Sequence, residues 1–166
     1  MDVSLSFRVG DKAVYPAHGV AEVTGIETKE IGGSKTSFYI LRILENGMRI
    51  MVPTKNVGTV GLRAVVKKAE VKEVYDILKS REVSVDSQTW NRRYREYMEK
   101  IKTGSVYEVA EVLRDLSLLK NDKELSFGER KMLDTARSLL VKELAIAKNT
   151  KEEKIDRELA EIFTLA

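Results

Sequence analysis

The sequence predicts an α+β protein of two domains, a small β-barrel followed by a compact bundle of five helices. Two observations support this prediction. In residues 1–62, short apolar runs alternate with turns rich in glycine, which is typical of β-strands. From residue 63 onward, apolar side chains recur with a period of about 3.6 residues, which is typical of amphipathic helices. We therefore expect one domain over residues 1–65 and a second over residues 66–166.

The N-terminal half contains candidate strands at 9–16, 20–31, 36–44 and 48–52, with a short last strand within 56–62. Gly25 inside the second run predicts a bulge, and Gly32-Gly33 predicts the turn that follows it. Asn46-Gly47 predicts a type I′ hairpin turn, in which both residues have positive φ. Several short, bent strands of this kind are typical of small barrels of the SH3 or Tudor type, which are usually binding modules.

The fourth run is a candidate docking strand. Its residues alternate between a core set and an outer set: Met48, Ile50 and Val52 against Arg49 and Met51. Met51 and Pro53 beside an exposed edge would suit docking of another protein, because methionine adapts to irregular surfaces. Packing of Met51 beneath a loop fits the sequence equally well, so this alternative stays open.

The helical half opens with apolar residues at helical spacing: Val71, Val74, Tyr75 and Leu78. Three later helices begin with the pattern of a capping box, in which Ser or Thr precedes Glu by three positions: Ser105 with Glu108, Ser126 with Glu129, and Thr150 with Glu153. In such a box the hydroxyl and the carboxylate accept hydrogen bonds from backbone N–H groups that the first turn leaves unpaired. Each box stabilises its helix by about 1 kcal/mol.

Residues 87–102 predict the helix that is most informative about function. At about 100° per residue, one side carries Trp90, Tyr94, Tyr97, Met98 and Ile101, and the other carries Arg92, Arg95 and Lys102, with Arg93 and Lys100 on the flank. Trp90, the only tryptophan, lies in the first turn beside three arginines. Such a ring can enter a DNA base step while the arginines hold phosphates. From this segment alone, a core position for Trp90 beside a solvated basic face is favoured.

The sequence contains no recognisable catalytic or metal-binding pattern. It has no cysteine and a single histidine, His18, which lies between Ala17 and Gly19 in a turn. Glycine-rich phosphate-binding motifs are absent, and no apolar run is long enough to span a bilayer. The net charge of +3 permits a nucleic-acid partner without requiring one. We expect a cytoplasmic protein with no cofactor, no secretory signal and no membrane association.

Four runs of the sequence resemble the CarD/CdnL family of bacterial transcription regulators: VGDKAVYPAHGV, SFYILRILENGMRIMVP, TWNRRYREYMEKIKTGSVYEVAEVLRDL and LSFGERKMLDTARSLLVKELA. These runs occur in order and cover both halves of the sequence. The resemblance is closest to the stand-alone CdnL type, because the acidic and AT-hook tail of the original CarD does not follow them. It implies a Tudor-like barrel and a helical DNA-binding domain.

The resemblance implies that residues 1–65 form an RNA-polymerase interaction domain, shared with transcription-repair coupling factor, that docks on the polymerase β subunit. The residues it places in that contact are Lys29, Arg49, Met51 and Pro53. Lys29 and Met51 both fall where some family members carry an arginine. Because Met51 replaces a charge, we expect docking here to be more apolar than in those members.

For residues 66–166 the resemblance implies a DNA-binding domain, and we expect its DNA contacts at Trp90, Arg92, Arg93, Arg95, Arg130 and Lys131. Trp90 matches the family tryptophan that wedges into the minor groove at the upstream edge of the melted −10 region, and Arg92 matches a basic residue beside it. Arg130 and Lys131 either hold phosphates at a helix N-terminus or face solvent. The family stabilises the open promoter complex, commonly with the primary sigma factor holoenzyme.

We expect a monomer that reaches the nucleoid through the polymerase. Two other functions stay open at this stage. The chain could be an independent DNA-binding regulator that acts on its own operator, which would need tight duplex binding without polymerase. It could also be a protein-interaction adaptor whose bundle does not contact DNA.

Overall fold

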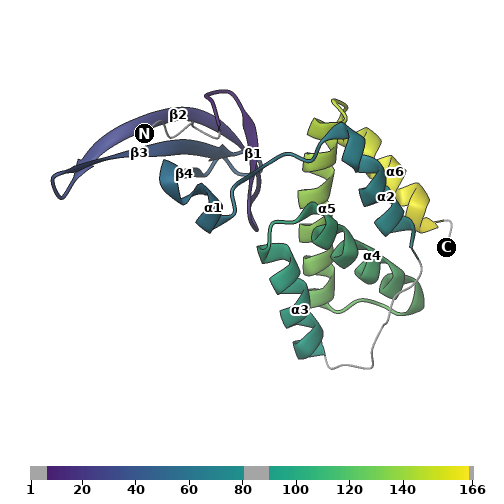
Figure 1. Ribbon diagram of the computed structural model, residues 1–166. Coiled ribbons are helices and arrows are strands. Elements are labelled where there is room, and N and C mark those ends of the chain that lie inside the picture. The colour runs from purple at the N-terminus through teal and green to yellow at the C-terminus, as the bar shows by residue number, and fades with distance from the viewer. Residues whose placement is uncertain (1–6, 81–89, 165–166) are drawn as a thin grey trace. The chain divides into compact units, whose positions relative to one another are not determined.

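The computed structural model describes residues 7–80 and 90–164. Contacts between Cα atoms divide the chain into two compact units, Met1–Val65 and Val66–Ala166. The first unit contains the strands and the second contains the long helices, as Figure 1 shows.

The first unit is a five-stranded antiparallel sheet with a Tudor-like fold, as predicted. Its strands are β1 (Lys12–Tyr15), β2 (Gly19–Ile31), β3 (Ser34–Ile43), β4 (Arg49–Pro53) and β5 (Arg63–Ala64). They pair in the order β4-β3-β2-β1-β5, so β4 and β5 are the edges of the sheet. One face buries the core of this unit: Phe7, Ala13, Ala21, Val23, Tyr39, Leu41, Ile43, Val52 and Leu62.

The turns agree with the sequence in position but not always in type. The register of β2 against β3 shifts between Val23 and Gly25, which confirms the predicted bulge. The hairpin between β3 and β4 is also confirmed, but its predicted type I′ turn is wrong, because only Gly47 has a positive φ, of 74°. Asn46 instead uses its side chain, whose Oδ1 accepts from the backbone N–H of Met48 at 2.9 Å.

The strand predicted within 56–62 is wrong. Residues Thr54–Asn56 form a 3₁₀ turn and Val57–Val60 form the short helix α1, while the last strand is β5. Gly61 ends α1 in the left-handed conformation, with a φ of 79°, and its N–H bonds to the carbonyl of Val57. This turn lets Leu62 enter the core, where it is 5% exposed.

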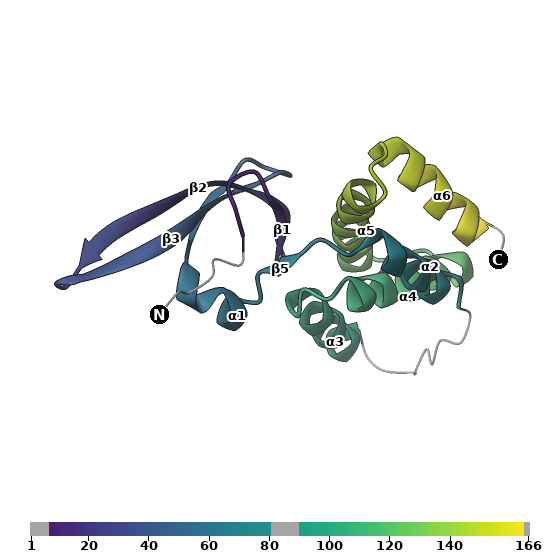
Figure 2. The ribbon, with the colours of Figure 1, turned by 45° about the horizontal axis from the view of Figure 1, so that its top comes forward.

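The second unit contains five α-helices among its described residues, as predicted. They are α2 (Val71–Lys79), α3 (Trp90–Lys102), α4 (Val106–Asp122), α5 (Phe127–Ala147) and α6 (Glu152–Thr164), preceded by a 3₁₀ turn at Lys68–Glu70. Helix α4 packs against α2, α3 and α5, while α6 packs against α5 and α2. Figure 2 shows α3 and α6 on opposite sides of this bundle. Residues 87–89 of the predicted functional helix lie outside the described residues.

The three predicted capping boxes have different outcomes. The box of Ser126 and Glu129 is fully formed at the start of α5. Ser105 precedes α4 but its side chain makes no capping bond, and the other half of the box is replaced: the Ser105 N–H donates to the hydroxyl of Thr103, which itself donates to the Glu108 carboxylate. Helix α6 begins at Glu152, so Lys151 rather than Thr150 occupies the position directly before it.

A buried carboxylate fixes the start of the second unit. Glu143 of α5 is 4% exposed, and its Oε2 accepts a hydrogen bond from the backbone N–H of Val66 at 2.8 Å. Because a buried carboxylate needs such partners, this bond holds the first residue of the unit against α5.

Candidate nucleic-acid and protein interfaces

Helix α3 begins at Trp90, so the tryptophan lies in the first helical turn as the sequence predicts. Its side chain is outside the described part of the structure, so its contact with DNA stays a prediction. Further along the predicted apolar side, Ile101 is buried and Tyr97 and Met98 pack against the core. Tyr94 is 43% exposed, which differs from the prediction, because the core contacts of α3 lie in its C-terminal half.

The arginines of α3 divide into two groups. Arg92 and Arg95 are exposed and form no ion pair with any described residue. The Arg93 side chain is only 16% exposed, and its Nη2 lies 3.9 Å from Oε2 of Glu129 on α5. Arg93 is therefore positioned to hold α3 against α5, whereas Arg92 and Arg95 are positioned to meet an external anion.

Glu129 connects three segments around this point. It is 1% exposed, and its Oε1 accepts from the backbone N–H of Ser126 at 2.9 Å and lies 3.2 Å from Nζ of Lys123. Burial acts to raise the pKa of Glu129, but hydrogen bonds from Ser126 and Lys123 outweigh it, so the pKa lies below its usual value. The carboxylate is thus an anion at neutral pH that joins α3, the α4–α5 connection and α5.

Arg130 and Lys131 are exposed in the first turns of α5 and form no ion pair within the described ranges. Because the preceding residue, Glu129, meets Arg93, these cations lie at the same end of the bundle as the start of α3. We call the exposed cations of this end the basic corner: Arg92, Arg95, Lys123, Arg130 and Lys131. The amides of Ser126 and Glu129 already bond within the capping box, so charged side chains dominate any phosphate contact here.

In the first unit, all the residues expected to dock on polymerase share the outer face of the sheet, opposite the core. Register places Met51 beside Ile40, Pro53 beside Phe38, and Arg49 beside Arg42. Directly paired residues of an antiparallel sheet point to the same face. Lys29 on β2 belongs to the same face, and its Nζ lies 4.0 Å from Sδ of Met51.

The charges of this outer face are largely paired with one another. Arg49 Nη2 lies 3.3 Å from Glu27 Oε1. Each carboxylate oxygen of Glu22 lies 3.0 Å from a cation: Oε1 from Lys12 Nζ and Oε2 from Arg42 Nη2. The hydrogen bond and the charge of Lys12, followed by Arg42, lower the pKa of Glu22. Met51 and Pro53 are half-buried beside these pairs, so they form an apolar element on a face whose charges largely cancel.

The β4 strand also offers backbone groups, because it is an edge of the sheet. The N–H of Ile43 bonds to the carbonyl of Met48, so the alternation of an antiparallel ladder directs Ile50 and Val52 toward β3. The backbone N–H and C=O groups of Arg49 and Met51 then point to the open edge, where a strand from another protein can add.

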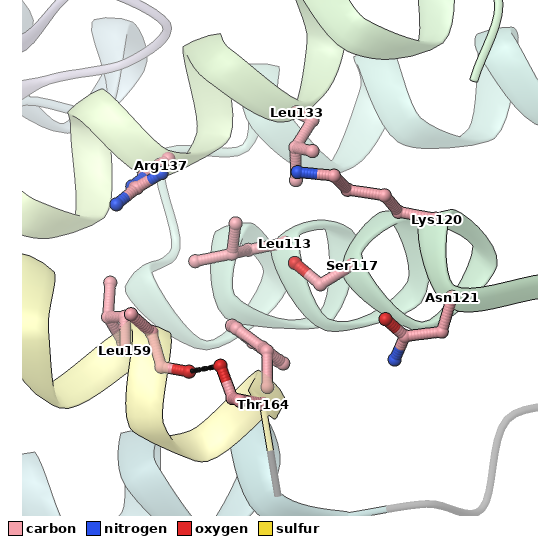
Figure 3. Close-up of a pocket in the computed structure, with 10 residues that line it drawn as sticks. Leu113, Ser117, Lys120, Asn121, Leu133, Arg137, Leu159 and Thr164 are labelled. Atoms are coloured by element: carbon pink, nitrogen blue, oxygen red, sulfur yellow. Dashed lines mark hydrogen bonds between the residues drawn. The ribbon is translucent and has the colours of Figure 1, made fainter. Parts of the chain in front are cut away.

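A cavity of about 390 Å³ lies between α4, α5 and α6. Figure 3 shows Leu113 and Leu159 at its wall and the hydroxyl of Ser117 pointing inward, with Lys120 and Arg137 at its margin. Arg137 is engaged by Asp156, with Nε donating to Oδ1 at 2.9 Å. The cavity contains none of the residues predicted for either interface. In the described part of the chain, no group of three potential metal ligands occurs, and no helix is long and apolar enough to cross a bilayer.

Comparison with known families assigns both units. Residues 7–66 match the CarD-like/TRCF RID domain, and residues 73–160 match the C-terminal domain of CarD. The chain belongs to the CarD family. The Bacillus subtilis (strain 168) protein named "Putative transcription factor YdeB" is 37% identical over 149 residues, covering 90% of this chain and 97% of YdeB.

Two solved structures from Myxococcus xanthus are similar to the first unit. The N-terminal domain of CdnL is 59% identical, with 40% of this chain and 93% of that chain covered and a TM-score of 0.32. The 72-residue N-terminal domain of CarD is 41% identical, with 38% and 84% covered and a TM-score of 0.32.

The CarD assignment sets the general function. The chain is a CarD/CdnL-family transcription factor, and the family consists of transcription regulators rather than known enzymes. The domain matched by the first unit is one that interacts with RNA polymerase in the family generally.

Proposed function

We propose that this CarD-family chain docks on the RNA polymerase β subunit through its first unit and stabilises the open promoter complex through its second. It acts in the cytoplasm as a monomer on the primary sigma factor holoenzyme. The observation that carries the DNA half of the proposal is the basic corner, where cations from α3, α5 and the α4–α5 connection gather beside the first turn of α3.

The DNA contact combines a wedge with phosphate clamps. Unstacking one base step costs on the order of a few kcal/mol, so Trp90, inserted at the upstream edge of the melted −10 region, offsets part of this cost. The ring gains little on closed duplex, and this difference in affinity shifts the promoter toward the open form. Arg92, Arg95, Arg130 and Lys131 hold the adjacent phosphates, while Arg93 acts by fixing α3 to Glu129.

The polymerase contact uses the outer face and the open edge of β4. A strand of the β subunit adds to the edge at Arg49 and Met51, and Met51 and Pro53 supply apolar contact. Lys29 and Arg49 flank this contact and set its register. Docking raises the effective concentration of the helical unit at one promoter position, so its own affinity for DNA can be weak.

The decisive test replaces Trp90. With holoenzyme on a promoter that opens slowly, Trp90→Ala loses most of the increase in open-complex lifetime that the chain provides, because the wedge is removed. Trp90→Phe retains part of it, and Arg157→Ala, an exposed cation of α6, serves as a matched surface control. Binding to polymerase is measured in parallel and stays unchanged. An unaltered lifetime with Trp90→Ala removes the wedge from the mechanism.

Two measurements separate this function from the alternatives. A mobility-shift titration without polymerase gives weak duplex binding, whereas nanomolar binding supports an independent regulator. Promoter crosslinking with Arg92→Ala and Arg95→Ala together decreases if the basic corner holds DNA. Undiminished crosslinking supports an adaptor.

A further inference from the structure

Phe127 is the most exposed large apolar side chain in the described part of the chain. It is the first residue of α5, and 76% of its surface is accessible. Single exposed apolar residues are common on protein surfaces, but an aromatic ring with so much accessible area contributes little to folding. Within the described part of the second unit, the other large apolar side chain of this kind is Tyr94, at 43%.

Phe127 lies at the basic corner, so its exposed ring lies near several cations. Two positions later, the carboxylate of Glu129 meets Arg93 of α3 and Lys123 of the preceding connection. Arg130 and Lys131 follow along the same first turns of α5. The formed capping box fixes the backbone of this turn, so the ring is presented from a rigid helix end rather than from a loop.

The surrounding charge decides which kind of partner suits the ring. A protein surface with an apolar pocket for Phe127 would also have to match several cations. Nucleic acid supplies both requirements at once, because phosphates pair with the cations and every base offers a flat face for stacking. In duplex DNA these faces are covered by neighbouring bases, whereas in melted DNA they are exposed.

We propose that Phe127 is a second aromatic DNA contact, carried by α5 and separate from Trp90, which stacks on an unpaired base of melted promoter DNA. The inference rests on the proposed function in taking promoter DNA as the partner. The Phe127 contact differs from the Trp90 wedge because it lies on the single-stranded region itself rather than at its upstream edge. The second unit would then distinguish melted from closed DNA through two helices, α3 and α5.

Binding measurements with the full chain test the stacking contact. The probes are two labelled promoter fragments of one length, one fully paired and one with a permanent bubble over the −10 region. Phe127→Ala weakens binding to the bubble fragment about tenfold, since a base stacked on an aromatic ring is lost. Binding to the paired fragment changes less than twofold, and Phe127→Tyr, which keeps the ring, stays near wild type.

Ile31→Ala, which removes an exposed apolar side chain of the first unit that is 57% accessible, is the matched control and leaves both fragments unaffected. Equal affinity of wild type and Phe127→Ala for the bubble fragment overturns the inference. So does an equal loss on both fragments, which assigns the ring to duplex contact. Circular dichroism checks that the helices remain folded in each variant.

A photo-crosslinker identifies the partner directly. With p-benzoylphenylalanine at position 127, the complex with holoenzyme and the bubble fragment yields adducts on DNA, and adducts only on a polymerase or sigma subunit overturn the inference. The result for Phe127 can be distinguished from the result for the Trp90 wedge. DNA adducts at 127 combined with an unchanged lifetime for Trp90→Ala reject the wedge and retain the Phe127 contact.

Discussion

The outer face of the sheet and the basic corner both carry several charged side chains, but they arrange them in opposite ways. On the sheet, Glu22 and Glu27 pair with Lys12, Arg42 and Arg49 at 3.0–3.3 Å. At the corner, the carboxylate that joins the elements, Glu129, is buried. The charges of the first surface are largely paired with one another, whereas four cations of the second are exposed and form no ion pair with a described residue: Arg92, Arg95, Arg130 and Lys131.

Because of this difference, the two surfaces are expected to act over different distances. Paired charges produce little field at a distance, so in the proposed function the sheet recognises its partner by shape, apolar contact and strand addition once contact is made. Cations that lack a carboxylate partner attract phosphates over the Debye length, about 8 Å at physiological ionic strength. A protein that docks on one macromolecule and holds another gains from this separation, because DNA does not compete for the docking face.

The comparison predicts that salt affects the two contacts very differently. If Arg92, Arg95, Arg130 and Lys131 neutralise four phosphates, DNA affinity falls about 10²-fold between 50 and 200 mM salt. Binding of the chain to the isolated polymerase β subunit changes by less than about threefold over this range, because its charges are internally paired. Titrations of both partners in parallel salt series measure the two slopes.

Variants of the basic corner provide the control for the salt dependence of DNA affinity. Arg92→Ala with Arg95→Ala reduces the dependence on salt by about two phosphate equivalents, while the distant Arg157→Ala leaves it unchanged. Matching slopes for DNA and polymerase would show that the distinction between a neutralised and a charged surface has no functional meaning.

The apolar part of the docking face gives the second largest expected effect. Met51→Ala combined with Pro53→Ala weakens binding to the β subunit about tenfold, because the substitutions shorten two apolar side chains that docking would bury. Promoter fragments without polymerase are bound as before. Lys35→Ala at the exposed β2–β3 hairpin is a matched control on the same sheet. Undiminished β binding by the double variant would place docking on another surface.

Local signals in the sequence predicted much of this fold. The capping box at Ser126, the bulge at Gly25 and the burial of Val74 and Leu78 all follow from residues close together in the chain. Family resemblance added the roles that we propose for the two surfaces. The register of β4 then showed that residues from separate strands, such as Lys29 and Met51, share one face.

The errors arose where a side chain had an alternative partner. Asn46 bonds to the N–H of Met48 and therefore does not need a positive φ, and Thr103 takes the Glu108 carboxylate that a capping box at Ser105 would use. The inward position of Arg93 depends on Glu129, which is distant in sequence, so helical periodicity could not reveal it. The exposure of Phe127 was not predicted, because a lone aromatic beside a capping residue gives no periodic signal.

The smallest expected effect tests whether Glu129 holds the basic corner together. Glu129→Gln keeps the shape of the side chain but removes the charge shared by Arg93 and Lys123, so it lowers the free energy of unfolding by about 1 kcal/mol at pH 7. DNA affinity falls severalfold, because α3 loses its fixed position relative to Arg130 and Lys131. Urea unfolding and DNA titration measure the two effects.

The pH dependence of this difference distinguishes a charge from a packing effect. The pKa of Glu129 is lowered in the folded state, so its contribution is complete above the ordinary carboxylate pKa and is lost as pH falls through the folded value. Wild type and Glu129→Gln should therefore converge in stability as the pH falls from the ordinary carboxylate range through the lower folded pKa of Glu129. Ser126→Ala, which removes one capping bond and leaves the carboxylate, retains a pH dependence like that of wild type. A stability gap that stays constant from pH 7 to pH 3 would mean that Glu129 acts by filling space, and the basic corner would then owe its geometry to packing alone.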